Sequence, residues 1–285
     1  MHLKAIINNA ATRQLLYAAL AILATASSAH ASPKPLPFSY MHSVEPLGGF
    51  EIESNIDMSP VRVSRETDNG TEAVTGMRME LETELEVGLG DGLEFGWYFD
   101  FRQEASGRGA AIEWKGVKQR LRYQLAPEGV WPIDVALYLE VAELDDEIEI
   151  EEKVLLSKRI GPFRAAINLW IEQEYYFQED LWKLVYHPTA GVVYDLSPHA
   201  SIGLEYWARG RFDDNQPKSG ITGTSAAADT TKAVQYLGPI VHLATSHGPW
   251  FSIGAYVRLD ALGDDAVVGD PYGQLWFRAV VGFDL

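Results

Sequence analysis

Apolar and charged residues alternate along most of the chain. Between Met77 and Leu89 every second residue is apolar with one exception, and the charged residues between them are Arg78, Glu80, Glu82, Glu84 and Glu86. Because successive side chains of a β-strand point to opposite faces, this period of two predicts a strand with one apolar and one charged face. Strands of soluble proteins are usually about 5–6 residues long, whereas about 9–11 tilted residues cross a bilayer. The run is long enough to span a membrane.

The same alternation recurs to the end of the chain and predicts an all-β protein, since no stretch shows a helical period. Pro188 and Pro239 interrupt two of the segments, because proline removes a donor from the strand ladder. Twelve strands are the preferred count, with ten or fourteen as alternatives. The predicted strands are 49–57, 75–89, 93–103, 113–125, 133–142, 148–160, 163–176, 183–194, 200–212, 233–245, 250–259 and 272–285.

The connections between these segments differ at the two ends of the strands. Those after even-numbered strands are tight turns rich in Gly and Pro, such as residues 90–92 and 161–162. Those after odd-numbered strands are more variable, and we expect long loops at 58–74 and 213–232. Short turns at one end and long loops at the other are typical of outer-membrane barrels, and an even strand number places both termini on the periplasmic side.

The C-terminus resembles the closing strand of Gram-negative outer-membrane β-barrels, since Phe277, Ala279, Val281, Phe283 and Leu285 alternate up to the last residue. That family usually ends in Phe or Trp, so the final Leu departs from its pattern. The resemblance is to twelve-stranded porin and channel-type barrels. It implies a closed, antiparallel, up-and-down transmembrane barrel over residues 49–285 in the outer membrane. Its expected partners are outer-membrane lipids, lipopolysaccharide and the assembly machinery, which would read the C-terminal strand.

The N-terminus predicts export. Residues 1–31 combine Lys4 and Arg13, an apolar run and an Ala29-His30-Ala31 cleavage site, as a cleavable signal peptide does. The apolar run is shorter than the ~20 residues of a membrane-spanning helix, which argues against an anchor. We expect residues 32–48, which contain several prolines, to form a periplasmic N-terminal segment.

Composition excludes several other functions. The chain contains no Cys, so disulfides and thiolate chemistry are absent. Without the two basic residues of the signal peptide, 21 basic side chains face 40 acidic ones. Such an acidic chain is not expected to bind nucleic acid. We expect no cofactor.

Alternation alone also fits a soluble periplasmic β-barrel or sandwich with its apolar face turned inward. Export, long strands, the loop asymmetry and the C-terminal strand favour the membrane barrel. In that case the charged faces line the lumen. An acidic wall is predicted from Glu51, Glu53, Glu80, Glu82, Glu84, Glu86, Glu94 and Asp100, and a basic wall from Lys118, Arg120, Arg122, Lys153, Arg159 and Arg164.

Two interpretations of these walls remain open. Walls of opposite sign across a water-filled constriction would filter small polar solutes, which predicts a passive channel or porin. Alternatively the charges meet as cross-strand pairs that fill the lumen, which predicts a plugged or narrow barrel with a structural or surface-binding role. Inward aromatic residues such as Trp170 and Trp207 are expected to fill space rather than to form a sugar-stacking track.

An outer-membrane hydrolase acting on lipid or peptide is the less favoured alternative. It would need a His with a Ser or carboxylate partner near the loop end, and only His187 lies on that side. Of the others, His199, His242 and His247 lie near the turns, and His42 lies in the N-terminal segment. Three acidic pairs in separate loops are weak candidates for binding a metal ion: Asp145 and Asp146, Asp213 and Asp214, and Asp264 and Asp265.

Overall fold

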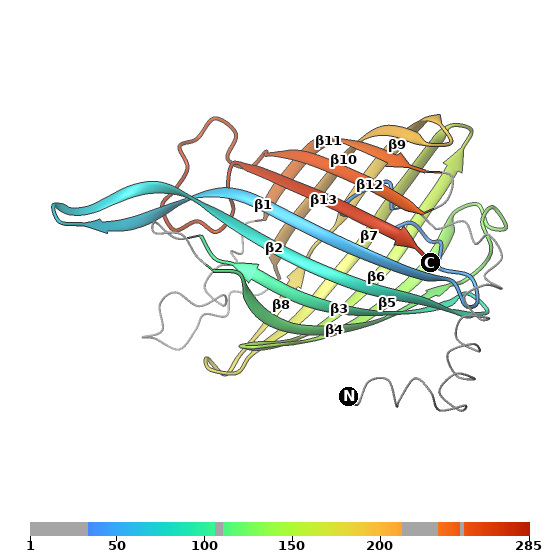
Figure 1. Ribbon diagram of the computed structural model, residues 1–285, viewed down its shortest axis with the longest axis horizontal. Helices are drawn as coiled ribbons and strands as arrows, with labels where there is room; N and C mark the ends of the chain where they lie inside the picture. The colour runs from blue at the N-terminus through green and yellow to red at the C-terminus, as the bar shows by residue number, and fades with distance from the viewer. Residues whose placement is uncertain (1–33, 106–110, 213–232, 246–247) are drawn as a thin grey trace, which may run out of the picture.

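Most of the described chain forms a closed antiparallel barrel (Figure 1). The computed structural model describes residues 34–105, 111–212, 233–245 and 248–285. These residues include no helix long and apolar enough to cross a membrane. The strands are β1 (Phe50–Thr67), β2 (Gly70–Gly90), β3 (Leu93–Gln103), β4 (Glu113–Gln124), β5 (Asp134–Leu144), β6 (Glu147–Ile160), β7 (Phe163–Tyr176), β8 (Leu181–Tyr186), β9 (Thr189–Ser197), β10 (Ala200–Arg211), β11 (Val234–Ala244), β12 (Pro249–Arg258) and β13 (Leu275–Asp284).

These thirteen segments form a barrel of twelve strands, because β8 and β9 are two halves of one interrupted strand. Both pair with β7 and with β10, and the register continues without a shift from Ile171↔Tyr186 to Asn168↔Thr189. Pro188 interrupts this strand as predicted. Pro239 does not divide β11, although the ladder to β12 lacks pairs between Leu237 and Ile240. The predicted strand number is therefore confirmed, and β1 closes the barrel on β13 from Glu51↔Asp284 to Met58↔Phe277.

The two faces of the wall are inverted relative to a soluble protein. On β5 the outward side chains of Leu137 and Leu139 are 44% and 45% exposed, while the inward Tyr138 and Glu140 are buried. The same inversion holds on β7, where Ile167 is 49% exposed and Glu172 is buried. An apolar outer surface around a charged interior is stable only in a lipid bilayer. The soluble alternative is therefore wrong, and the protein is an outer-membrane barrel.

The first hairpin corrects one prediction. The predicted loop at 58–74 is instead paired backbone, because β1 and β2 continue in register to Thr67↔Gly70. This hairpin projects well past the rim of the barrel at the end opposite the C-terminus (Figure 1). Beyond the rim the alternation of apolar and polar residues is lost, because polar residues replace the apolar ones that face lipid. The hydrogen bonds between the two backbones do not depend on that alternation. The other predicted long loop, 213–232, and the signal peptide lie outside the described residues.

Candidate functional site

The charged residues predicted for the lumen largely neutralise one another. Arg120 of β4 is completely buried, and its guanidinium lies 2.8 Å from Glu84, 3.1 Å from Glu86 and 2.5 Å from Glu94. Arg122 reaches the same Glu94 at 2.8 Å. Cross-strand register brings these residues together, because β3 pairs with β2 on one side and with β4 on the other. This part of the lumen is filled by ion pairs.

Other members of the two walls are paired in the same way nearer the loop end. Lys118 lies 2.7 Å from Glu82. Glu80 binds Arg78 at 2.6 Å and Arg102 at 3.1 Å. Asp100 is buried directly opposite Glu82 on β2. The acidic wall therefore does not present free carboxylates along its whole length.

Two predicted members of the basic wall lie at the turn end. Arg159 is at the end of β6 with its side chain 46% exposed, and Arg164 begins β7 across the same turn. Both bind Asp195 of β9, at 3.0 and 2.7 Å. The structure thus places them on the rim rather than along the lumen, because they flank the 161–162 turn.

Of the predicted N-terminal segment, residues 34–45 lie inside the barrel, whereas 46–48 are exposed where the chain leads through Gly49 into β1. The sequence predicted a periplasmic segment over 32–48 and did not predict that this segment enters the lumen. Its backbone is held by inward side chains: Glu205 accepts from the amides of Phe38 and Ser39 at 3.1 and 2.7 Å, and Asn168 bonds both the amide and the carbonyl of Tyr40 at 2.7 and 2.9 Å. Polar groups that would have been hydrated in the periplasm find their partners in the wall.

Further contacts fasten both ends of this segment. Lys34 binds Glu53 of β1 at 3.0 Å, and its carbonyl accepts a bond from Ser252 of β12. At the other end Glu94 accepts from the amide of Glu45 at 2.6 Å. The backbone there passes so close to Gly88 that a Cβ atom at position 88 would lie 1.9 Å from the Pro46 carbonyl oxygen. We call residues 34–49 the plug, since residues 34–45 cross the lumen and contact opposite sides of the wall.

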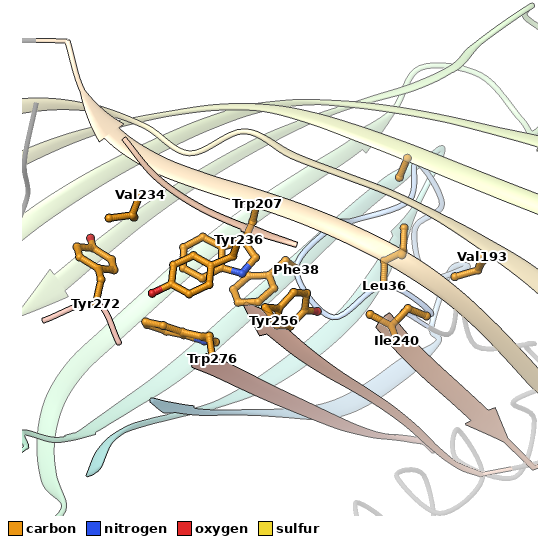
Figure 2. Packing of buried hydrophobic residues seen from close by; sticks show 11 residues of the cluster. Leu36, Phe38, Val193, Trp207, Val234, Tyr236, Ile240, Tyr256, Tyr272 and Trp276 are labelled. Carbon is orange, nitrogen blue, oxygen red and sulfur yellow. The ribbon is translucent and has the colours of Figure 1, made fainter. Parts of the chain in front are cut away.

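Phe38 anchors the middle of the plug in an aromatic box. Its ring centroid lies 4.9 Å from that of Trp207 and 5.2 Å from that of Tyr256, and the Arg278 guanidinium lies 3.9 Å from the ring. Figure 2 shows Phe38 among the inward aromatic residues of β10 to β13. As predicted, these aromatic residues fill space. The sequence signals that could have revealed the plug are the apolar Leu36 and Phe38 within an otherwise Pro-rich stretch.

Three of the histidines hold structure. His42 of the plug bonds Ser157 of β6 through Nδ1 at 2.7 Å, and His242 bonds Ser252 in the same way at 2.8 Å. His187, the one candidate for catalysis, lies 3.4 Å from Glu172 and stacks on Trp170 with centroids 4.1 Å apart. Both His–Ser pairs are buried, so neither serine is open to a substrate.

His42 gives the plug a pH dependence. Burial lowers the pKa of His42, and Asp134, Glu128, Arg122 and Lys158 are the charged groups that act on it. A histidine with a lowered pKa binds a proton more readily once its segment has left the wall. The seated plug is therefore fully stable above pH about 6.5, the ordinary histidine value, and weakens as the pH falls below it.

We expect backbone amides 38–42 to exchange hydrogen faster at pH 5 than at pH 7.5, after correction for the intrinsic rates. Mass spectrometry of the peptide that covers the plug measures this difference. A His42→Gln variant retains a polar side chain without the titration and should show no such dependence. Equal protection at both pH values in the unaltered protein would contradict the prediction.

A cavity of about 850 Å³ occupies the loop-end half of the lumen. Phe38 and Tyr40 of the plug belong to its lining, together with Trp170, Trp207 and other aromatic residues. Its acidic lining residues are Glu80, Glu82, Glu104, Glu140, Asp145, Asp146, Glu147, Glu149, Glu151, Glu172 and Glu174, and its basic ones are Arg78, Arg102, Lys115, Lys118, Lys153, Arg209 and Arg278. The cavity is thus polar, with an excess of negative charge.

The acidic pairs in the loops do not form a metal site within the described chain, where no group of three His, Asp or Glu side chains is arranged to hold a metal ion. Asp145 binds Lys115 at 3.0 Å beside Asp146, and Asp264 and Asp265 are exposed in a different loop. Asp213 and Asp214 lie outside the described residues.

Comparison with known proteins supports the fold. No protein-family model matches the sequence, and no curated protein matches it. The COG4313 outer-membrane channel from Pseudomonas putida F1 has a TM-score of 0.60 at 10% identity, covering 90% of this chain and 100% of that chain. The NanC porin has a TM-score of 0.55 at 13% identity, covering 83% of this chain and 100% of that one. The chain therefore shares its fold with outer-membrane channels and porins.

Proposed function

We propose that the protein is a passive outer-membrane channel for small polar solutes, closed at rest by its own plug. The observation that carries this proposal is the charged cavity at the loop end, with Phe38 and Tyr40 in its lining. The plug is attached to the wall by hydrogen bonds, packing and the Lys34–Glu53 ion pair, and its covalent connection is through Gly49 to β1. A segment held in this way can leave the lumen without unfolding the barrel.

The predicted walls take different roles under this proposal. The pairs around Arg120 brace the turn-end half, whereas Glu80, Glu82, Lys118 and Lys153 border the cavity and meet the solute. We further propose that lipopolysaccharide surrounds the loop end and that the assembly machinery reads β13, whose alternation is intact to Phe283. The likeness of fold to a channel and a porin supports a transport role rather than a hydrolase.

A disulfide lock tests the proposal. Because His42 and Ser157 are in direct side-chain contact and the chain contains no other Cys, a His42→Cys/Ser157→Cys variant would form a single bond between plug and wall. In planar bilayers we expect discrete conductance steps from the unaltered protein, their suppression in the oxidised variant and their return after reduction. The single His42→Cys variant is the matched control, since it should be insensitive to reductant.

A plugged barrel with a structural or surface-binding role is the second candidate, favoured by the extent to which the plug fills the lumen. It predicts that reducing the locked variant leaves the conductance at zero. Heat-modifiable migration on gels shows in each case that the barrel is folded, so the absence of steps in a folded, reduced barrel would reject the channel.

A further inference from the structure

The wall holds the plug through its backbone as well as through its side chains. Glu205 accepts hydrogen bonds from two consecutive amides, those of Phe38 and Ser39, at 3.1 and 2.7 Å. Asn168 accepts from the amide of Tyr40 and donates to its carbonyl, at 2.7 and 2.9 Å. Backbone amides and carbonyls are present in every peptide, whatever its sequence. These two wall side chains therefore recognise a peptide backbone.

The wall also provides separate spaces for two side chains of the plug (Figure 2). Leu36 is completely buried in a cluster that includes Val193 and Ile240, and a Cβ atom at Gly191 would lie 2.6 Å from a methyl carbon of Leu36. A glycine in a strand often marks a point of close approach, and here it leaves the room that the leucine needs. The ring of Phe38 occupies the aromatic box. The wall thus accepts an aliphatic and an aromatic side chain two residues apart.

The plug fits this site incompletely. Within the described chain, Trp207 Nε1 on the wall, and Ser39 Oγ and His42 Nε2 on the plug, are buried without a hydrogen-bond partner. Trp207 is only 1% exposed, and its ring packs against that of Phe38. A buried donor without an acceptor weakens the complex that contains it. A ligand with an acceptor for the Trp207 indole can therefore replace the plug.

We propose that the site vacated by the plug binds short peptides with an aromatic side chain, and that the plug occupies it at rest as a tethered substitute for the solute. This inference rests on the proposed channel function, of which it specifies the solute class. Excess negative charge in the adjoining cavity favours the approach of a peptide through its cationic amino terminus. The covalent tether gives the plug a high effective concentration, so a solute displaces the plug only when that solute is abundant.

Calorimetric titration with the acetylated and amidated peptide Leu-Pro-Phe-Ser-Tyr, the sequence of residues 36–40, tests the proposal. The protein is the full chain with Phe38→Pro/Ser39→Pro, which removes both amide donors and the aromatic ring from the plug and leaves the wall unaltered. We expect this variant to bind the peptide. The unaltered protein should bind it at least about tenfold more weakly, because its own plug competes for the site.

Two controls separate recognition of the peptide backbone from adsorption to aromatic rings. The same peptide with ester linkages in place of the amides of its Phe and Ser keeps every side chain and loses both donors to Glu205, so its affinity should be at least about tenfold lower. Adding Glu205→Ala to the full-length variant should lower the affinity of the amide peptide by the same factor. Glu152→Ala is the matched substitution, since Glu152 points outward to Gln173 and should leave the affinity unchanged.

Equal affinity for the amide and ester peptides would overturn the proposal, and this comparison needs no substitution in the wall. If amides 40–42 remain as protected from hydrogen exchange in the Phe38→Pro/Ser39→Pro variant as in the unaltered protein, the contacts at Phe38 and Ser39 do not hold the plug and the proposal is also overturned. Peptide binding to a barrel that conducts no ions after release of the disulfide lock would reject the channel and retain the peptide site. Conductance without peptide binding would retain the channel and reject the peptide site, so the two failures are distinguishable.

Discussion

Deletion of residues 34–46 is expected to turn the closed barrel into a continuously conducting pore. The deletion removes Phe38 and Tyr40 from the lining of the cavity and the two amide donors from Glu205, which keeps the hydrogen bond from Tyr256 and is otherwise hydrated. The strand pairing of the wall does not involve these residues, so the barrel stays closed on itself. Single-channel recording in planar bilayers should show long open periods at a single high conductance, where the full-length protein shows rare openings.

A milder change should give an intermediate result. Glu205→Ala removes the acceptor for the amides of Phe38 and Ser39, and hydrogen bonds to a charged group contribute about 1.5–3 kcal/mol each. Loss of about 3 kcal/mol shifts the ratio of seated to released plug about a hundredfold. Glu152→Ala removes an equal charge from the outer face and is the control. A folded deletion variant that conducts no more than the full-length protein would show that something other than the plug closes the lumen.

The barrel could be predicted from sequence because its information is local. On β5, for example, Leu137 and Leu139 must face lipid and Tyr138 and Glu140 must face inward, and each strand carries this pattern by itself. The turns confirm the order of the strands independently. Even the interruption of the eighth barrel strand at Pro188 could be predicted from the sequence, since proline lacks the backbone donor that the strand ladder needs.

The plug could not be predicted because its partners are dispersed. Glu205, Asn168, Ser157 and Ser252 each come from a different strand, and on its own strand each is only one polar residue on the inward face. No spacing along the chain relates them. They meet only because the closed barrel brings β6, β7, β10 and β12 around one lumen.

The distribution of charge inside the barrel could not be predicted from the sequence either. Much of the predicted acidic wall is neutralised, since Arg120 and Arg122 of β4 lie within reach of Glu84, Glu86 and Glu94. Carboxylates that are buried without an ion pair within the described chain include Glu51 of β1, Asp100 of β3, Glu147 of β6 and Glu205 of β10. Which charges remain free depends on strand register and side-chain length, and neither can be read from the alternation that predicts the strands.

The ion-pair cluster around Arg120 should be the part of the barrel most sensitive to substitution. Arg120→Ala leaves Glu84, Glu86 and Glu94 buried beside one another, with Arg122 as the remaining cation close to Glu86 and Glu94. Removing one partner from a buried ion pair typically costs about 3–5 kcal/mol, because the other charge is left without compensation. We expect a loss of this size in the free energy of unfolding, measured by urea titration of the folded barrel in lipid vesicles.

Two further variants separate charge from packing at this position. Arg159→Ala removes the same side chain at the exposed rim and should change the stability by less than about 0.5 kcal/mol. Adding Glu84→Gln and Glu86→Gln to Arg120→Ala removes the repulsion and should restore a large part of the loss. If the triple variant is no more stable than Arg120→Ala, the cost arises from the cavity left by the arginine, and the carboxylates around it are not strongly repelling one another.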